Sequence, residues 1–197
     1  MSSYSMNREE ALKIVDELVQ SPNIRKHCLA AEAAMRALAR ELRVKNRESR
    51  DKENFNEEEW GLVGLLHDAD YEVTDKDSEK HTQVVSEKIQ GKAPQEVIDA
   101  IKGHADKVER KTLMAKAIFA TDELTGLIVA AALVRPDKKL EGLTAESVLK
   151  RMKEPGFARA VNREDIKTCE TELGIPLAEF VEIVLDAMKG ISKELGL

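Results

Sequence analysis

Apolar residues recur at helical spacing along nearly the whole 197-residue chain, and the alternating pattern of strands is almost absent. The sequence therefore predicts an all-α fold, a helical bundle. Polar or Pro- and Gly-containing breaks separate the helical segments. We predict helices at about Asn7–Val19, Asn23–Arg43, Glu57–His67, Glu79–Ile89, Pro94–Gly103, Leu113–Leu133, Ala145–Lys153, Arg163–Leu173 and Leu177–Leu195.

The segment Glu57–His67 is apolar on nearly every side, which is typical of a helix buried at the centre of a bundle. Gly61 and Gly64 would let neighbouring backbones approach it closely. Lys45–Asn54 is polar and is predicted to be a surface loop. The break after Arg135-Pro136 suggests two parts: residues 1–135 as the principal helical domain, and residues 136–197 as a C-terminal helical extension that packs on the same core.

Composition narrows the class of protein. With 42% hydrophobic and 35% charged residues, the chain is expected to be globular rather than disordered. A net charge of −6 argues against a nucleic-acid polymer as partner. No signal peptide or 18-residue apolar run is visible, so we expect no membrane association and a cytoplasmic location. Cys28 and Cys169 lie singly in apolar helical stretches and are expected to be small buried hydrophobes.

The positions of the histidines indicate what chemistry the protein performs. The chain has four, each at helical spacing from apolar residues, and two aspartates join the series: His27, His67, Asp68, His81, His104 and Asp122. A single histidine on an apolar face is more often an ordinary core or surface residue than a ligand. Here every histidine of the chain shares that position, and mixed imidazole and carboxylate ligands suit Mn, Fe, Co, Ni or Zn. We therefore predict a site for a divalent transition metal.

In its order of residues the chain resembles the HD-domain superfamily of metal-dependent phosphohydrolases. His27, the pair His67-Asp68 in GLLHDADYE and Asp122 in FATDELTGL carry the resemblance, which covers about residues 23–133. It implies an HD-type helical bundle and one divalent ion on these four side chains. Members with two further histidines between the pair and the last aspartate often bind two ions, and His81 and His104 occupy those positions. Asp68 would then bridge the two ions.

The resemblance also implies a reaction. A phosphomonoesterase or phosphodiesterase would act on a small phosphorylated metabolite or nucleotide through a metal-bound water. We predict Asp68 and Asp70 as catalytic residues, Asp70 because the loop after His67 must pass the site. Asp70, Glu72 and Glu123 stand beside the expected ligands and could orient the water or a ligand histidine; Glu123 is interpreted as an ordinary solvated acid. The chain lacks the Gly-Lys and Gly-Tyr-Pro motifs of the cyclic-dinucleotide phosphodiesterases, which disfavours that activity.

A phosphate substrate needs positive charge near this acidic site. Basic residues concentrate between positions 150 and 167, and Lys153, Arg159 and Arg163 are predicted to bind substrate. Asn162 could cap a helix whose free N–H groups would help to bind the anion. The alternative is a solvated basic face. A homodimer through the amphipathic C-terminal helix is possible on this sequence.

Two other functions fit the same residues. Some superfamily members with six such ligands resemble di-iron oxygenases, which would require iron and oxygen. The third possibility is a regulatory or binding module stabilised by its metal. Structural sites are usually closed by protein ligands, whereas catalytic sites keep open positions.

Overall fold

The computed structural model describes residues 6–46 and 54–197, and all of its regular structure within those residues is helical. The all-α prediction is confirmed. The helices are α1 (Arg8–Leu18), α2 (Pro22–Lys45), α3 (Glu57–Leu66), α4 (Gln83–Ile89), α5 (Gln95–His104), α6 (Leu113–Leu133), α7 (Ala145–Met152), α8 (Arg163–Glu172), α9 (Leu177–Gly190) and α10 (Ser192–Leu195).

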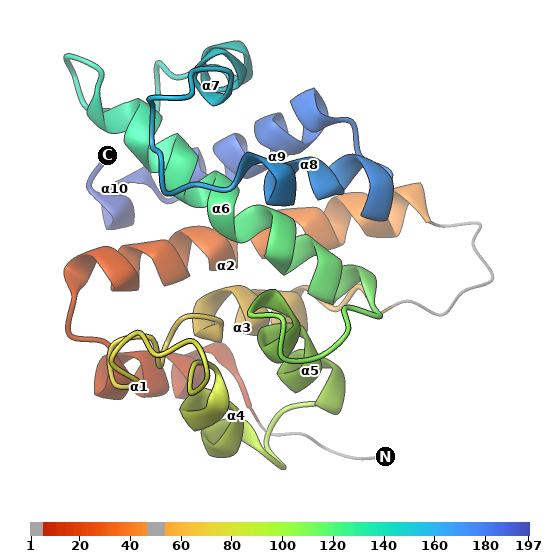
Figure 1. The fold of residues 1–197 in the computed structure, drawn as a ribbon. Coiled ribbons are helices and arrows are strands. Elements are labelled where there is room, and N and C mark those ends of the chain that lie inside the picture. The colour runs from red at the N-terminus through yellow and green to blue at the C-terminus, as the bar shows by residue number, and fades with distance from the viewer. Residues whose placement is uncertain (1–5, 47–53) are drawn as a thin grey trace.

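Helix α2 runs through the middle of the bundle (Figure 1). Helices α1, α3, α4 and α5 lie on one side of it, and α6 to α10 lie on the other, with α3, α6 and α9 packed directly against it. It begins where Ser21 accepts a hydrogen bond from the backbone N–H of Ile24 and Pro22 occupies the first helical position. Cys28, Met35 and Leu38 form part of its fully buried stripe.

Helix α3 is the most deeply buried helix of the N-terminal half. Every residue from Trp60 to Leu66 is buried, as the sequence predicts. Gly64 faces the backbone of α2 so closely that a Cβ there would lie 2.4 Å from the carbonyl oxygen of Ala31. The predicted close approach is therefore confirmed at Gly64. Gly61 instead faces the side chain of Arg36.

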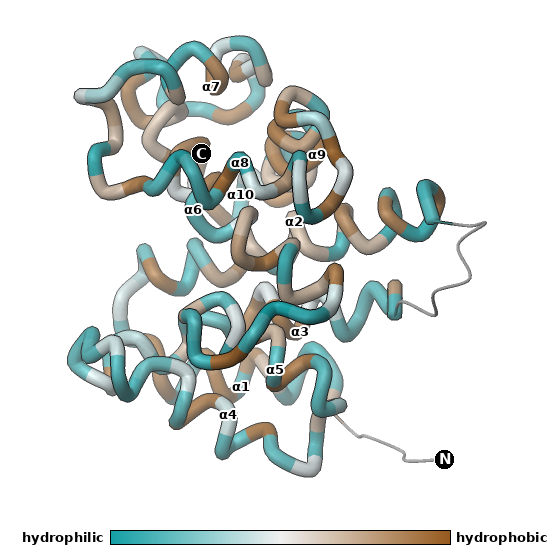
Figure 2. The backbone as a smooth tube through the Cα atoms, turned by 45° about the vertical axis from the view of Figure 1, so that its right-hand side comes forward, coloured by the Kyte–Doolittle hydropathy of each residue, from teal (hydrophilic) through white to brown (hydrophobic). Residues whose placement is uncertain are grey.

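Residues from both halves of the chain contribute to one hydrophobic core. Helices α8 and α9 pack on α6 and α2, and they bring Ile166, Phe180 and Val184 into contact with the N-terminal helices' buried residues. Cys28 and Cys169 are free and buried, as predicted. Figure 2 shows hydrophobic positions recurring along the helices, with hydrophilic ones on many of the connecting turns. In the described parts of the chain, no helix combines the length and apolarity that crossing a bilayer requires.

Two predicted helices differ from the structure. The helix predicted from Glu79 begins at Gln83, because Thr82 adopts a left-handed backbone conformation with φ of 72°. The helix predicted for Leu177–Leu195 ends at Gly190, a residue of low helix propensity, and a short α10 follows. Of the polar segment 45–54, residues 47–53 lie outside the described residues, so the loop prediction is untested there.

The contact between Gly64 and α2 gives a prediction for stability. Replacing Gly64 with Ala forces the Cβ onto the Ala31 carbonyl, so α3 and α2 must separate, and we expect a loss of roughly 1–3 kcal/mol. Urea unfolding of the two proteins would measure it. Gly190→Ala is the matched control, because a Cβ there meets open space in a helix and should stabilise by about 0.5–1 kcal/mol. Equal effects of the two substitutions would contradict this account.

Candidate metal centre

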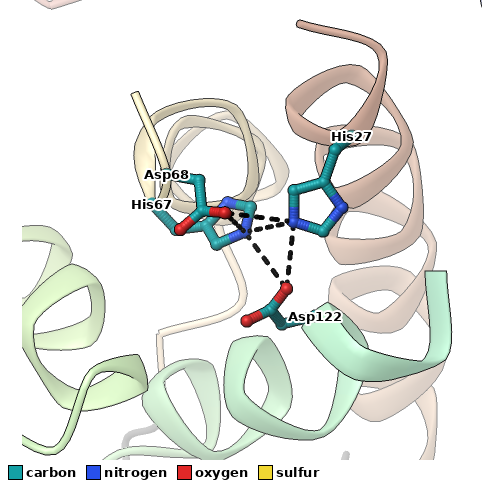
Figure 3. Close-up of side chains that lie close together, drawn as sticks. All are labelled: His27, His67, Asp68 and Asp122. Carbon is teal, nitrogen blue, oxygen red and sulfur yellow. Dashed lines mark hydrogen bonds and ion pairs between the residues drawn. The ribbon is translucent and has the colours of Figure 1, made fainter. Parts of the chain in front are cut away.

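The structure brings the six predicted ligand residues together in two adjoining groups. The first group is His27, His67, Asp68 and Asp122, and the second is Asp68, His81 and His104. Within each group one ligand atom per residue lies within 4.8 Å of all the others. Figure 3 shows the first group, with the side chains of α2, α6 and the end of α3 directed toward one another. Asp68 belongs to both groups.

The elements explain why these side chains meet. His27 lies in the second turn of α2 and Asp122 in the middle of α6, two helices that pack against each other. His67 is the C-terminal cap residue of α3, so the chain turns there and carries Asp68 into the gap beside the two helices. The first group therefore depends on the buried position of α3.

The second group is built from segment ends. His104 is the last residue of α5. His81 lies in the turns before α4, and its predicted place on a helix is therefore wrong. Asp70, fully buried, accepts hydrogen bonds from the backbone N–H groups of Thr82 at 2.9 Å and Val85 at 3.1 Å, so its carboxylate replaces a side-chain cap at the start of α4.

Asp68 divides its two oxygens between the groups. Oδ2 lies 3.5 Å from Nε2 of His27 and 4.0 Å from Nε2 of His67. Oδ1 lies 3.1 Å from Nε2 of His81 and 3.4 Å from Nε2 of His104. Asp122 serves the first group, with its Oδ1 at 2.9 Å from Nε2 of His27. A carboxylate placed in this way could hold one ion with each oxygen.

The hydrogen-bond partners of the histidine Nδ1 atoms show which ring nitrogen carries the hydrogen and which one presents a lone pair to the centre. Nδ1 of His67 lies 2.8 Å from the Gly64 carbonyl, and Nδ1 of His104 lies 2.5 Å from the Ile101 carbonyl. Nδ1 of His81 lies 2.9 Å from Oδ1 of Asp70. Since carbonyl and carboxylate oxygens only accept, we assign the hydrogen of each neutral ring to Nδ1. Each Nε2 then presents a lone pair to the centre.

A hydroxyl group, rather than a carbonyl or carboxylate, fixes the position of the hydrogen on the His27 ring. Oγ1 of Thr125 donates to the backbone carbonyl of Asp122 at 2.8 Å and lies 3.2 Å from Nδ1 of His27. A hydroxyl whose hydrogen is engaged there accepts from Nδ1–H, which leaves Nε2 of His27 as an acceptor. Sequence reasoning missed Thr125, although its spacing of three from Asp122 on one helix would have indicated it.

This arrangement fits a divalent cation. The Nε2 atoms of His27 and His67 are 3.0 Å apart, and those of His81 and His104 are 3.1 Å apart. Two lone pairs at that distance repel each other, and the nearby carboxylate oxygens add to the repulsion. A positive charge among them removes it, and imidazole with carboxylate is a donor set for transition metals.

Protons compete for the same lone pairs. Burial lowers the pKa of His27, but hydrogen bonds and charge from Asp122 and Asp68 outweigh it and raise the pKa to about 10. The same balance, with Asp68 and Asp70 as partners, raises the pKa of His81 to about 9. Burial raises the pKa of Asp122, yet His27 and His67 lower it well below its usual range. Metal binding must therefore displace protons.

The three acids considered for auxiliary roles have different surroundings. Asp70 uses both oxygens on His81 and the start of α4, so it positions a histidine. Glu72 accepts from the backbone N–H groups of Gln20 and Ser21, at the connection between α1 and α2. Glu123 is half-buried and accepts from the N–H of Asn162, which contradicts its interpretation as a freely solvated acid; burial raises its pKa.

The three predicted substrate-binding cations do not form one cluster of free side chains. Lys153 and Arg159 are exposed on the segment between α7 and α8. Arg163 donates to the carbonyl oxygens of Ala158 at 2.7 Å, Val161 at 2.6 Å and Phe157, so its guanidinium holds that segment together. Asn162 caps α8, as the sequence suggests.

Comparison with known protein families supports the same residues. The HD domain matches residues 24–127, more than half of the chain, and this span contains all six ligand candidates. The chain belongs to the HD domain family, and the predicted resemblance is confirmed. Members of this family are commonly metal-dependent hydrolases, and the His/Asp cluster could hold a divalent metal. Neither the curated proteins nor the solved structures gave a match.

The raised histidine pKa values predict how the metal-free protein responds to pH. Folding raises the pKa of His27 from 6.5 to about 10 and that of His81 from 6.5 to about 9. The stability that these groups contribute is fully present below pH 6.5 and is lost as pH rises through about 9 to 10. We expect the Tm of chelator-treated protein to fall between pH 7 and 9.5. Thermal unfolding would measure it, and a flat profile would contradict the assignment.

The Asp70 contacts predict a selective metal-binding defect. In Asp70→Asn the amide cannot accept from His81 and both backbone N–H groups at once, so His81 loses its fixed orientation. We expect affinity for an ion at the second group to fall about 10- to 100-fold, while the first group is retained. Titration with metal analysis would measure it. Asp77→Asn is the control, since Asp77 caps a turn of the same loop without touching a histidine side chain.

Proposed function

We propose that this protein is a metal-dependent phosphohydrolase that acts on a small phosphorylated substrate. One observation carries the proposal: two groups of inward-facing histidine nitrogens share the Asp68 carboxylate within an HD domain. A metal ion held there supplies Lewis-acid polarisation of a phosphoryl oxygen and lowers the pKa of a water molecule. His27, His67, Asp68 and Asp122 would hold one ion, and His81 and His104 would hold a second with Asp68.

Differences in exposure support a catalytic site over a purely structural one. The side chains of His27 and Asp122 are 24% and 29% exposed, and that of Asp68 is 19% exposed. The side chain of His67, on the opposite wall, is fully buried. The first group is thus reached by solvent on one side and backed by protein on the other. Catalytic metal sites keep such an open side, whereas structural sites are closed.

The remaining residues of the site hold the histidine rings in position. Thr125 holds the His27 ring by its outer nitrogen, and Asp70 holds His81 in the same way. The carbonyls of Gly64 and Ile101 hold His67 and His104. Because each ring is fixed from behind, the nitrogens need no rearrangement when substrate binds, which lowers the reorganisation that catalysis requires.

A di-iron oxygenase is the second candidate. The shared position of Asp68 favours it as much as it favours a dinuclear hydrolase, because a bridging carboxylate suits either pair of ions. Metal identity separates the two. Iron in protein purified from its native host, with oxygen consumption on a substrate panel, would support the oxygenase, and a redox-inert metal would support the hydrolase.

The hydrolase proposal predicts metal-dependent phosphate release. His67→Ala and Asp122→Ala each remove a donor from the first group, so we expect release from a panel of phosphoesters to fall at least about 100-fold. Asp77→Asn, outside the centre, should keep full activity. Release that persists in chelator-treated protein would overturn the proposal, as would full activity in both alanine variants.

A further inference from the structure

A groove of about 370 Å³ lies between α2 and α6, next to the first ligand group. This volume is within the range of small-molecule sites. Its walls come from α2, α6 and the segment around α10. The lining residues, named the α2–α6 groove below, are Asn23, Lys26, His27, Ala30, Thr125, Gly126, Val129, Leu133, Leu195, Gly196 and Leu197.

The groove continues the metal centre along both helices. On α6, Gly126 and Val129 follow Asp122 by four and seven residues, so they lie on the same face as this ligand. On α2, Asn23 precedes His27 by four residues and Ala30 follows it by three, again on one face. His27 belongs to both the ligand group and the groove lining. A molecule that reaches the first group from this side must therefore lie in the groove.

The floor and walls of the groove are mainly aliphatic. Ala30, Gly126 and Val129 offer no hydrogen-bonding side chain, and Leu133 leaves 48% of its surface exposed at the edge. Gly126 has room beside it, since a Cβ would meet only Val161 at 3.9 Å. Among the lining residues of this described region the one ring is the imidazole of His27, which belongs to the first ligand group.

One cation belongs to the groove lining. Among the residues that the structure describes, the side chain of Lys26 makes no ion pair or hydrogen bond, unlike those of Lys45 and Lys88, which pair with glutamates. Its Nζ lies beside the α10 segment, 3.0 Å from where a Cβ on Gly196 would be. The groove thus combines metal ligands, aliphatic walls and the ammonium group of Lys26.

On the basis of the proposed function, we propose that the α2–α6 groove binds the alcohol part of the substrate. The substrate class is a phosphate monoester of a compact aliphatic alcohol that carries a second anionic group. The phosphate lies at the metal centre, the aliphatic part lies against Ala30, Gly126 and Val129, and the second anion pairs with Lys26. Burial of the aliphatic part supplies affinity, and Lys26 supplies specificity.

Phosphonates test the groove without any hydrolysis. We would load the full chain with Mn²⁺ under anaerobic conditions and measure Kd by calorimetry for methylphosphonate and pentylphosphonate. The extra methylene groups bury apolar surface in the groove, so pentylphosphonate should bind at least about tenfold more tightly. Equal affinities, or no binding of either phosphonate, would overturn the proposal.

A variant that fills the groove tests whether the preference for pentylphosphonate arises there. In Gly126→Val the new side chain is added at a groove-lining position, where a Cβ meets only Val161 at 3.9 Å and fits without a clash. The preference for pentylphosphonate should fall to less than about twofold, with methylphosphonate affinity and Mn²⁺ content unchanged. Gly190→Val makes the same change at a position outside the groove lining, where a Cβ meets open space, and should keep the preference. A preference that survives Gly126→Val would overturn the proposal.

A second variant tests the anion site. Pentylphosphonate with a terminal carboxylate should bind about five- to tenfold more tightly than pentylphosphonate to the wild-type chain, and Lys26→Gln should remove that difference alone. An unchanged difference in Lys26→Gln would remove Lys26 from the proposal. A failure of this proposal can be told apart from a failure of the proposed function. Binding in the groove without turnover of any ester would reject only the hydrolase. Turnover that depends on neither the chain length of the ester nor Gly126→Val would reject only the groove.

Discussion

Four imidazole nitrogens and two carboxylates meet in two adjoining groups, in each of which one ligand atom per residue lies within 4.8 Å of the others, and the surrounding helices must hold them there. Acceptor atoms 3.0 Å apart are not stable neighbours without positive charge between them. Protons can supply that charge, as the raised pKa of His27 indicates, and divalent ions can supply more of it. The fold holds the donors together from behind through Gly64, Ile101, Asp70 and Thr125.

The two ligand groups are held by different kinds of element. The first rests on packed helices, and Gly64 of α3 lies so close to α2 that a Cβ there would be 2.4 Å from the carbonyl oxygen of Ala31. The second rests on the end of α5 and on a turn whose geometry depends on Asp70. A single buried carboxylate therefore couples the start of α4 to the orientation of His81. This difference explains why the second group is expected to be lost first when the loop is perturbed.

The charge of the surroundings limits which substrates suit the site. Glu123 lies next to Asp122 and takes the N–H of Asn162, and Arg163 is engaged with carbonyl groups. The arginine that the sequence offered for anion binding is thus already engaged, and the N-cap residue of α8 faces a carboxylate. Metal ions would supply the positive charge for a phosphate, and Lys26 in the lining of the α2–α6 groove would supply charge for a second anionic group.

Helical periodicity, the six ligand candidates and the buried α3 were all readable from the sequence, because each depends on spacing along a single helix or on one run of apolar residues. Residue type and spacing alone were enough to identify the donor set and the family. Contacts between distant segments were not readable: the two oxygens of Asp68 facing different groups, Asp70 fixing His81 from eleven residues away, and Arg163 turning back on its own loop. Only the tertiary structure decided these, because a side chain's partner depends on which backbone groups the packing leaves within its reach.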